Sequence, residues 1–255
     1  MKIVVLCKAS LSTDLLLARL SQRQDCELVV IRETAMPASA IIKFRRRHLG
    51  LTATLGQIAF MAIVPRLQAR ATKRRVNALI AAHGMFRETP PGIHIEQVDT
   101  VNDPVVIERL RAENPDVVLV NGTRIIKSRV IDAVPAPFIN THAGITPQYR
   151  GVHGGYWALY CNDRQNFGST IHLVDKGVDT GQVLAHVRSA PEPEDTFSTY
   201  PVVQYLATLP VMDRILDDLP AALDAAPEIA PDTPSRQWFH PTLWQYVRGR
   251  LRGVK

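Results

Sequence analysis

Short apolar runs alternate with amphipathic stretches along the first part of the chain, and this alternation predicts parallel strands joined by helices. Residues 2–7 and 26–31 are rich in β-branched side chains, as strands are. Between them, the apolar positions of residues 13–20 recur at helical spacing. We therefore expect a β-α-β unit at the start of the chain.

The same alternation resumes after an interruption. Residues 93–98, 116–120 and 138–140 are typical of strands, residues 103–113 of a helix, and residues 169–174 and 182–187 of a hairpin. The predicted fold class is α/β, a Rossmann-like, mostly parallel sheet with flanking helices. In such sheets ligands bind at the carboxyl ends of the strands.

Two regions fall outside this alternation. Residues 40–85 predict a basic helical insertion after the second strand. Beyond the hairpin, residues 195–219 predict one or two helices, residues 220–234 an irregular connector rich in Ala and Pro, and residues 241–255 a short basic helix. We therefore divide the chain into a catalytic domain, residues 1–190, and a small C-terminal helical extension, residues 191–255, packed on it.

Positive charge is concentrated in the insertion. The 255-residue chain has a net charge of +6, yet residues 34–87 hold ten Lys or Arg and no Asp or Glu, so the remainder is net acidic. One basic segment does not make a nucleic-acid-binding protein, and nucleic acid is disfavoured as a partner. Residues 43–75 could instead contact an anionic ligand or lie along an anionic membrane surface. The alternative is a helical pair packed on the core with a solvated basic face.

Crossing a bilayer is not expected, because the apolar part of the insertion, residues 49–64, is shorter than the roughly 20 residues of a spanning helix.

The three cysteines, Cys7, Cys26 and Cys161, lie far apart without a C-x-x-C pair. They predict buried thiols and neither disulfides nor zinc. The apolar run at residues 3–7 is too short for a signal peptide. We expect a cytoplasmic protein with no metal.

A polar stretch, FINTHAGITPQYRGVHGG, begins with the strand predicted at residues 138–140. Asn140 and His142 are two residues apart, so on a strand they project from the same face. An amide and an imidazole aimed at one carbonyl can both stabilise an oxyanion. A carboxylate beside the imidazole would raise the pKa of the histidine and help to move a proton, and Asp179 is the candidate. Taken alone, Asn140 and His142 could equally be turn residues.

Three motifs in order remove this ambiguity. The chain has N-x-H at Asn140, a proline-containing loop ending in glycine at residues 147–151, and D-x-G at Asp179 after a strand. This order resembles the formyltransferases that use N10-formyltetrahydrofolate. The resemblance implies that Asn140 and His142 stabilise the oxyanion, while Asp179 positions His142 or a water so that a proton passes from the attacking amine to the folate N10. It implies neither a metal nor an acyl-enzyme.

The resemblance also places the co-substrate N10-formyltetrahydrofolate between two segments. The implied pterin-contacting residues are Thr123, Arg124, Ile125, Ile126, Val174, Asp175, Gly177 and Val178. Arg124 could instead be a solvated cation, and Asp175 is interpreted as a turn residue rather than a second catalytic acid. His172 lies inside a predicted strand and is interpreted as structural, whereas His153 is left open as a contact to the acceptor.

Departures from the family pattern reduce the number of possible formyl acceptors. The loop after the first strand, residues 7–12, lacks the glycines of the glycinamide ribonucleotide enzymes, and the chain after residue 187 offers no pattern for the β-barrel of the initiator-tRNA enzymes. We predict transfer to a primary amine of an anionic small molecule, with a nucleotide-linked amino sugar admissible. The alternatives are a formyltetrahydrofolate hydrolase, a glycinamide ribonucleotide formyltransferase and a non-catalytic folate-binding module. A homodimer is left open.

Overall fold

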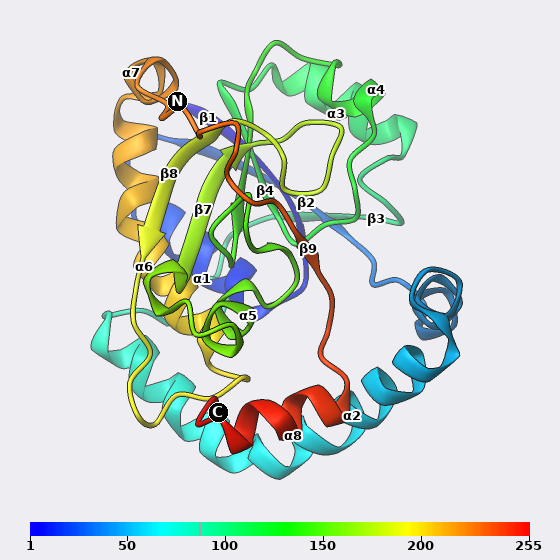
Figure 1. Ribbon diagram of the computed structural model, residues 1–255. Helices are drawn as coiled ribbons and strands as arrows, with labels where there is room; N and C mark the ends of the chain where they lie inside the picture. The colour runs from blue at the N-terminus through cyan, green and yellow to red at the C-terminus, as the bar shows by residue number, and fades with distance from the viewer. Residues whose placement is uncertain (87) are drawn as a thin grey trace.

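A seven-stranded sheet runs through the centre of the computed structural model, which describes residues 1–86 and 88–255 (Figure 1). The strand order is β3-β2-β1-β4-β5-β7-β8. The first five strands are parallel, and β7 and β8 continue the sheet as an antiparallel hairpin. The strands are β1 (Lys2–Lys8), β2 (Glu27–Glu33), β3 (Ile95–Val98), β4 (Val117–Asn121), β5 (Phe138–His142), β7 (Gly168–Leu173) and β8 (Val183–Arg188). This arrangement confirms the predicted fold class.

Helices cover both faces of the sheet, which explains why the central strands are apolar throughout. In β1, Ile3 and Val5 belong to a core cluster with helices α1 (Leu11–Leu20) and α6 (Tyr200–Asp217). Val4 and Leu6 point the other way, into a cluster with α3 (Pro104–Glu113) and α4 (Ser128–Ile131). All four side chains have no exposed surface.

The insertion forms one long helical element, α2 (Ala38–Ala82), which breaks only at Gly50, where φ is 81°. Its last turns join the core through Val76, Leu79 and Ile80. By length and composition alone, α2 as a whole is long and apolar enough to cross a membrane. The expectation that the insertion does not cross a bilayer stays a prediction. Arg87, which was counted in the basic segment, lies outside the described residues.

The last sixty-five residues, 191–255, wrap around the sheet domain. α6 begins at Tyr200 rather than near residue 195, and α7 (Leu219–Asp224) occupies the start of the stretch predicted to be an irregular connector. That part of the prediction is wrong, because Asp218 caps α7 by accepting a hydrogen bond from the Ala221 amide. α8 (Leu243–Leu251) starts with a capping box and lies along α2 (Figure 1). The division at residue 190 stays a prediction.

Several short elements lie between these layers: β6 (Arg150–Gly151), α5 (Gly154–Tyr160), the 3₁₀ helix η1 (Arg164–Asn166) and β9 (Gln237–Trp238). β6 and β9 form a separate two-stranded parallel sheet. An aromatic cluster packs beneath them and includes Phe60 of α2, Trp157 of α5 and Tyr246 of α8. The three cysteines are unpaired. Cys7 is buried, but Cys161 is exposed, contrary to the expectation of buried thiols.

Candidate active site

All eleven predicted site residues line a single cavity of about 560 Å³ at the carboxyl end of the parallel strands. β5 delivers Asn140 and His142 to the cavity, and the loop between β7 and β8 delivers Asp179. The other eight residues of this set come from the loop after β4 and from the β7–β8 loop. They are Thr123, Arg124, Ile125, Ile126, Val174, Asp175, Gly177 and Val178.

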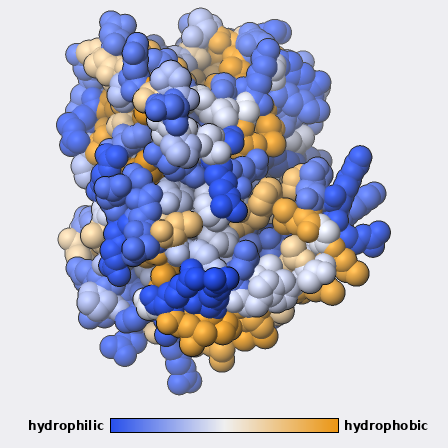
Figure 2. Space-filling view, viewed as in Figure 1, coloured by the Kyte–Doolittle hydropathy of each residue, from blue (hydrophilic) through white to orange (hydrophobic). Residues whose placement is uncertain are grey.

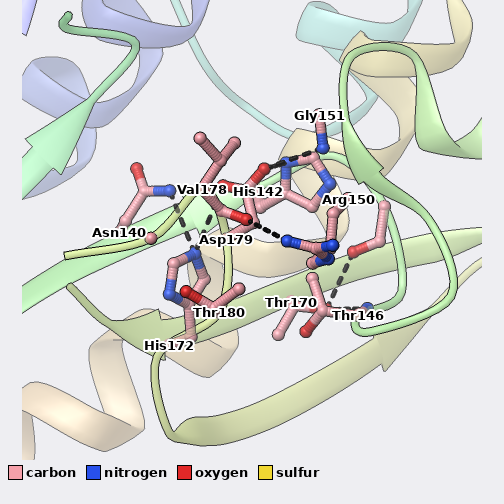
Figure 3. A network of polar contacts seen from close by, with 12 residues as sticks. Asn140, His142, Thr146, Arg150, Gly151, Thr170, His172, Val178, Asp179 and Thr180 are labelled. Carbon is pink, nitrogen blue, oxygen red and sulfur yellow. Dashed lines mark hydrogen bonds and ion pairs between the residues drawn. The ribbon is translucent and has the colours of Figure 1, made fainter. Parts of the chain in front are cut away.

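Asp179 lies between two imidazoles (Figure 3). Its Oδ2 is 3.4 Å from Nδ1 of His142, and its Oδ1 is 3.6 Å from Nε2 of His172. The backbone amide of Gly151 donates a 2.9 Å hydrogen bond to Oδ2. Asp179 itself has a left-handed backbone with φ 51°, a conformation that Asp and Asn adopt more readily than most residues. The carboxylate is therefore held by backbone as well as by side chains.

The hydrogen bonds of His142 determine which ring nitrogen is reactive. Nε2 lies 2.7 Å from the carbonyl oxygen of Tyr149. Because a carbonyl only accepts, Nε2 must carry a proton. In the neutral imidazole Nδ1 is then unprotonated, and Nδ1 is the atom that faces Asp179. The neutral ring therefore offers a proton acceptor at Nδ1, which could donate to an oxyanion only after protonation, and the role of His142 in stabilising the oxyanion stays a prediction.

His172 forms part of the site, although the sequence analysis interpreted it as structural. Its Nδ1 lies 2.7 Å from the Leu173 carbonyl and so is the protonated nitrogen, which leaves Nε2 as an acceptor for the Asn140 amide at 3.1 Å. This contact orients Asn140 and leaves its second N–H for a ligand. The signal for it is the pairing of Asn140 with His172 across β5 and β7, a register that the sequence alone does not state.

Burial dominates the electrostatics of His142. Burial lowers the pKa of His142 below its ordinary value, and the negative charge of Asp179 only partly offsets this effect. The expected rise in the pKa of the histidine is therefore wrong. Burial raises the pKa of Asp179, but the contact with His172, the positive charge that the His142 ring gains on protonation and the Gly151 amide together hold this pKa below its usual value. The resting pair is a neutral imidazole beside a carboxylate.

The loop that holds both His142 and Asp179 is itself held by the C-terminal segment. β9 pairs with β6, so that Gly151 lies opposite Trp238. The Trp238 indole donates a 3.0 Å hydrogen bond to the Gln148 carbonyl and stacks on Tyr149 with ring centroids 6.0 Å apart. Tyr149 supplies the carbonyl that fixes the tautomer of His142.

The loop after β4, which forms one wall of the cavity, is held by a buried carboxylate that the sequence analysis missed. Glu33, at the end of β2, is 4% exposed and accepts hydrogen bonds from the amides of Val101 and Arg124. The Arg124 guanidinium donates to the carbonyls of Asp99 and Thr34, so it braces the loop rather than standing free in solvent. This brace positions the Ile126 side chain, which lines the cavity. Contact with the pterin stays a prediction for these residues.

Three basic side chains also line the cavity. Lys8 is the last residue of β1, and Nε2 of His153 lies 3.1 Å from Nδ1 of His240. His153 is therefore placed where a ligand could meet it, together with His240, which the sequence analysis did not single out. Asp175 accepts from the Gly177 amide and the Thr180 hydroxyl, as a turn residue does. In the described part of the chain, no three His, Cys, Asp or Glu side chains are grouped to hold a metal.

Sequence comparison finds relatives among the methionyl-tRNA formyltransferases. The methionyl-tRNA formyltransferase of Finegoldia magna is 38% identical over 95 residues, which cover 37% of this chain and 30% of that protein. The enzyme of that name from Syntrophus aciditrophicus is 31% identical over 126 residues, 49% of this chain and 40% of that protein. The chain thus matches less than half the length of these relatives.

Solved structures match the fold over nearly the whole chain. A sugar N-formyltransferase from a Shewanella species has a TM-score of 0.54 at 15% identity, covering 93% of this chain and 76% of that one. Glycinamide ribonucleotide transformylase 1 from Symbiobacterium toebii has a TM-score of 0.55 at 16% identity, covering 94% of each chain. The sequence model described as formyl transferase matches residues 58–202, more than half of the chain and the whole of the N-x-H to D-x-G region. On this match the chain belongs to the formyl transferase family.

Proposed function

We propose that the protein transfers a formyl group from N10-formyltetrahydrofolate to a primary amine of an anionic small molecule. The observation that carries this proposal is the convergence of Asn140, His142 and Asp179 on one cavity whose lining includes both apolar side chains and the basic residues Lys8, His153 and His240. The family match and the curated relatives support formyl transfer from a folate in general terms. The acceptor is inferred from these basic residues.

The proposed reaction uses the protonation states that the hydrogen-bond partners imply. The free N–H of Asn140 would stabilise the oxyanion that forms when the amine attacks the formyl carbon. Nδ1 of His142 would take the proton that the attacking nitrogen loses, and Asp179 would stabilise the resulting imidazolium. The same proton would then pass to the folate N10 as the bond from N10 to the formyl carbon breaks. The amine gains the formyl group and loses one proton, and N10 gains that proton.

The cavity has apolar walls that suit a pterin. Its volume of about 560 Å³ lies within the range of small-molecule sites. Val120, Ile126 and Val174 supply apolar walls, and the two flanking loops expose backbone groups that a pterin edge could pair with. The brace from Glu33 to Arg124 keeps one of these loops in place. These features support the folate as the donor.

The acceptor is inferred from Lys8, His153 and His240, which also line the cavity. A phosphate or carboxylate on the acceptor would offset the positive charge of Lys8 and could accept hydrogen bonds from the imidazoles. Methionyl-tRNA is the second candidate acceptor, favoured by the 38% identity to an enzyme of that name. That identity extends over 95 residues, 30% of that protein, so it supports the type of reaction more strongly than the acceptor.

The test combines the protein with N10-formyltetrahydrofolate and a panel of amines: nucleotide-linked amino sugars, glycinamide ribonucleotide, charged initiator tRNA and neutral amines as controls. We expect mass spectrometry to show one added formyl group on an anionic small amine. Formate released without any amine would indicate a hydrolase, and formylation of the tRNA alone would select the second candidate. Folate binding without turnover on any amine would contradict an enzymatic function.

A further inference from the structure

The exposed apolar side chains of this protein gather on two helices. Among the described residues, fourteen large hydrophobic side chains are exposed, and nine of them belong to α2 and α8. These are Ile42, Phe44, Leu51, Leu55, Ile63, Leu67, Trp244, Val247 and Leu251. Two of them, Leu67 and Leu251, are more than 80% exposed. Scattered exposed apolar residues are ordinary, but a concentration on adjacent helices marks an interaction surface.

The apolar side chains lie on the outer side of α2, because the inner side packs on the protein. Phe60 and Val64 are buried in the aromatic cluster, and Gln57 donates a hydrogen bond to the His240 carbonyl. Leu51 and Leu55 are one helical turn apart and project on the opposite side. Figure 2 shows hydrophobic surface over α2 and α8, with hydrophilic side chains projecting beside it.

α8 extends the same surface. It lies against α2 where the Trp244 ring occupies the space beside Gly56, so that a Cβ added at Gly56 would be 2.2 Å from the ring. More than half of Trp244 remains exposed, and Val247 and Leu251 follow it on α8. The two helices therefore present one outer surface, which we call the α2–α8 surface and which consists of the nine apolar residues above and the exposed cations below.

The charge around this surface has one sign. Residues 34–86 and 233–255 contain no Asp or Glu. Among the described cations of α2 and α8, only Arg75 forms an ion pair, with Asp195 and Glu192 of the segment before α6. The other exposed cations face solvent. They are Lys43, Arg46, Arg47, Arg66, Arg70, Lys73 and Arg74 of α2, and Arg248 and Arg250 of α8.

Exposed apolar side chains beside exposed cations fit an anionic lipid surface better than they fit another kind of partner. An apolar helix face flanked by Lys and Arg is the pattern of helices that lie in the interface of a membrane, with the apolar side chains in the acyl boundary and the cations at anionic headgroups. A second copy of the chain would bring cations against cations. A nucleic acid would use the cations and leave Leu51, Leu55 and Trp244 without a role.

We propose that the α2–α8 surface docks on a membrane that contains anionic lipids. α2 does not cross the bilayer in this arrangement, since its inner side and its last turns are buried in the fold through Phe60, Val64 and Leu79. The segment before Gly50 carries Ile42 and Phe44 beside Lys43, Arg46 and Arg47, and a contact from Arg45 to the Met61 sulfur connects it to the rest of α2. This docking is independent of the proposed formyl transfer.

The experiment is vesicle flotation of the full chain. Vesicles of phosphatidylcholine alone are compared with vesicles of equal parts phosphatidylcholine and phosphatidylglycerol, at low and high salt. We expect binding to the anionic vesicles only, with weakening at high salt. The triple variant Lys43→Ser, Arg46→Ser, Arg47→Ser should lower the partition coefficient roughly 100-fold, given the contribution of each cation near a charged surface. Leu55→Gln should lower it about tenfold through the lost apolar insertion.

Matched controls use exposed residues of the same kind elsewhere. The triple variant Arg111→Ser, Lys127→Ser, Arg164→Ser removes three exposed cations outside α2 and α8, and Val105→Gln removes an exposed apolar side chain of α3. Both should float like the unmodified protein.

The docking proposal is overturned if the protein does not bind anionic vesicles, or if the α2 variants float as the controls do. The surface would bind nucleic acid instead if the protein bound tRNA but not vesicles, and if this binding depended on Arg46 but not on Leu55. It would be a self-association surface if the protein formed concentration-dependent dimers that Leu55→Gln abolished.

Discussion

The amide of Gly151 donates its hydrogen bond to the same carboxylate oxygen of Asp179 that faces His142. Gly151 has φ 95°, a conformation that favours glycine, and a Cβ there would lie 2.2 Å from the Trp238 carbonyl. The close approach of β9 and the placement of the catalytic carboxylate therefore depend on the same residue. The C-terminal segment is in this way part of the active-site framework.

Asp179→Asn should abolish most turnover while the protein stays folded. Asparagine tolerates the left-handed backbone at this position, so the loop should keep its shape. The neutral amide no longer stabilises a His142 imidazolium, and we expect kcat to fall by a factor on the order of 10² or more. Single-turnover formyl transfer measures the rate, and thermal unfolding followed by circular dichroism checks the fold.

Glu194→Gln is the control, because Glu194 is an exposed carboxylate outside the cavity. It should keep the kcat of the unmodified protein. A rate for Asp179→Asn within about threefold of this control would remove Asp179 from the mechanism.

Trp238→Ala should lower kcat without a matching change in the KM for the folate. Its indole holds Gln148 and Tyr149, and the Tyr149 carbonyl sets the tautomer of His142. Small displacements of a catalytic group can cost up to about 10² in rate. We expect a loss of 30-fold to 100-fold, roughly, for Trp238→Ala and a smaller one for Trp238→Phe, which keeps the stacking but not the N–H donor.

Trp244→Ala removes an indole of the same size from α8, away from the cavity, and should leave kcat unchanged. If Trp238→Ala and Trp244→Ala lower stability equally and neither alters kcat, Trp238 packs the protein without positioning the reaction.

Local sequence patterns were sufficient where the interactions are local or periodic. β1 is buried on both faces, so its continuous apolar run predicted a central parallel strand. Asn140 and His142 share a strand face, so their spacing predicted one target. α2 shows the limit of local signals, because Gly56 and Pro65 suggest breaks, yet only Gly50 leaves the helical conformation. Packing against the core and α8 offsets the weak helix propensity at the other two positions.

Tertiary contacts decided what the sequence did not reveal. His172 meets Asn140 only because β5 and β7 are antiparallel in one register. The pKa of His142 depends on how completely the ring is buried, and the neighbouring carboxylate predicts the wrong direction. β9 has two residues, too few for a periodic pattern, so its pairing with β6 follows from aromatic packing around Trp238.

Stability should decrease as the pH falls from about 6.5 toward 4, in part through His240. Burial, and then the charges of Arg45 and Lys8, lowers the pKa of His240 from 6.5 to about 4. The folded state therefore binds this proton less readily than the unfolded state. The stabilisation is complete above pH 6.5 and is lost as the pH falls through this range, by up to about 3 kcal/mol. The adjacent His153 also has a lowered pKa, mainly from burial, and titrates as part of the same pair.

Urea unfolding of His240→Asn at a series of pH values tests this prediction. The free energy of unfolding of the variant should decline less steeply than that of the unmodified protein between pH 6.5 and 4. His94→Asn, which replaces an exposed histidine, should follow the curve of the unmodified protein. Parallel curves for His240→Asn and the unmodified protein would contradict the assigned cause.

Arg75→Ala should destabilise the fold more than any neighbouring charge change on α2. The Arg75 guanidinium donates to both carboxylate oxygens of Asp195, whose side chain is fully buried, and Asp195 also accepts from the Thr199 hydroxyl. Removing the arginine leaves a buried carboxylate without its cation, at a cost of roughly 3 kcal/mol. Arg74→Ala removes the adjacent, exposed arginine and should change the free energy of unfolding by less than about 0.5 kcal/mol. Chemical denaturation of the two variants at neutral pH gives the comparison, and equal stabilities would show that the Asp195 carboxylate does not depend on Arg75.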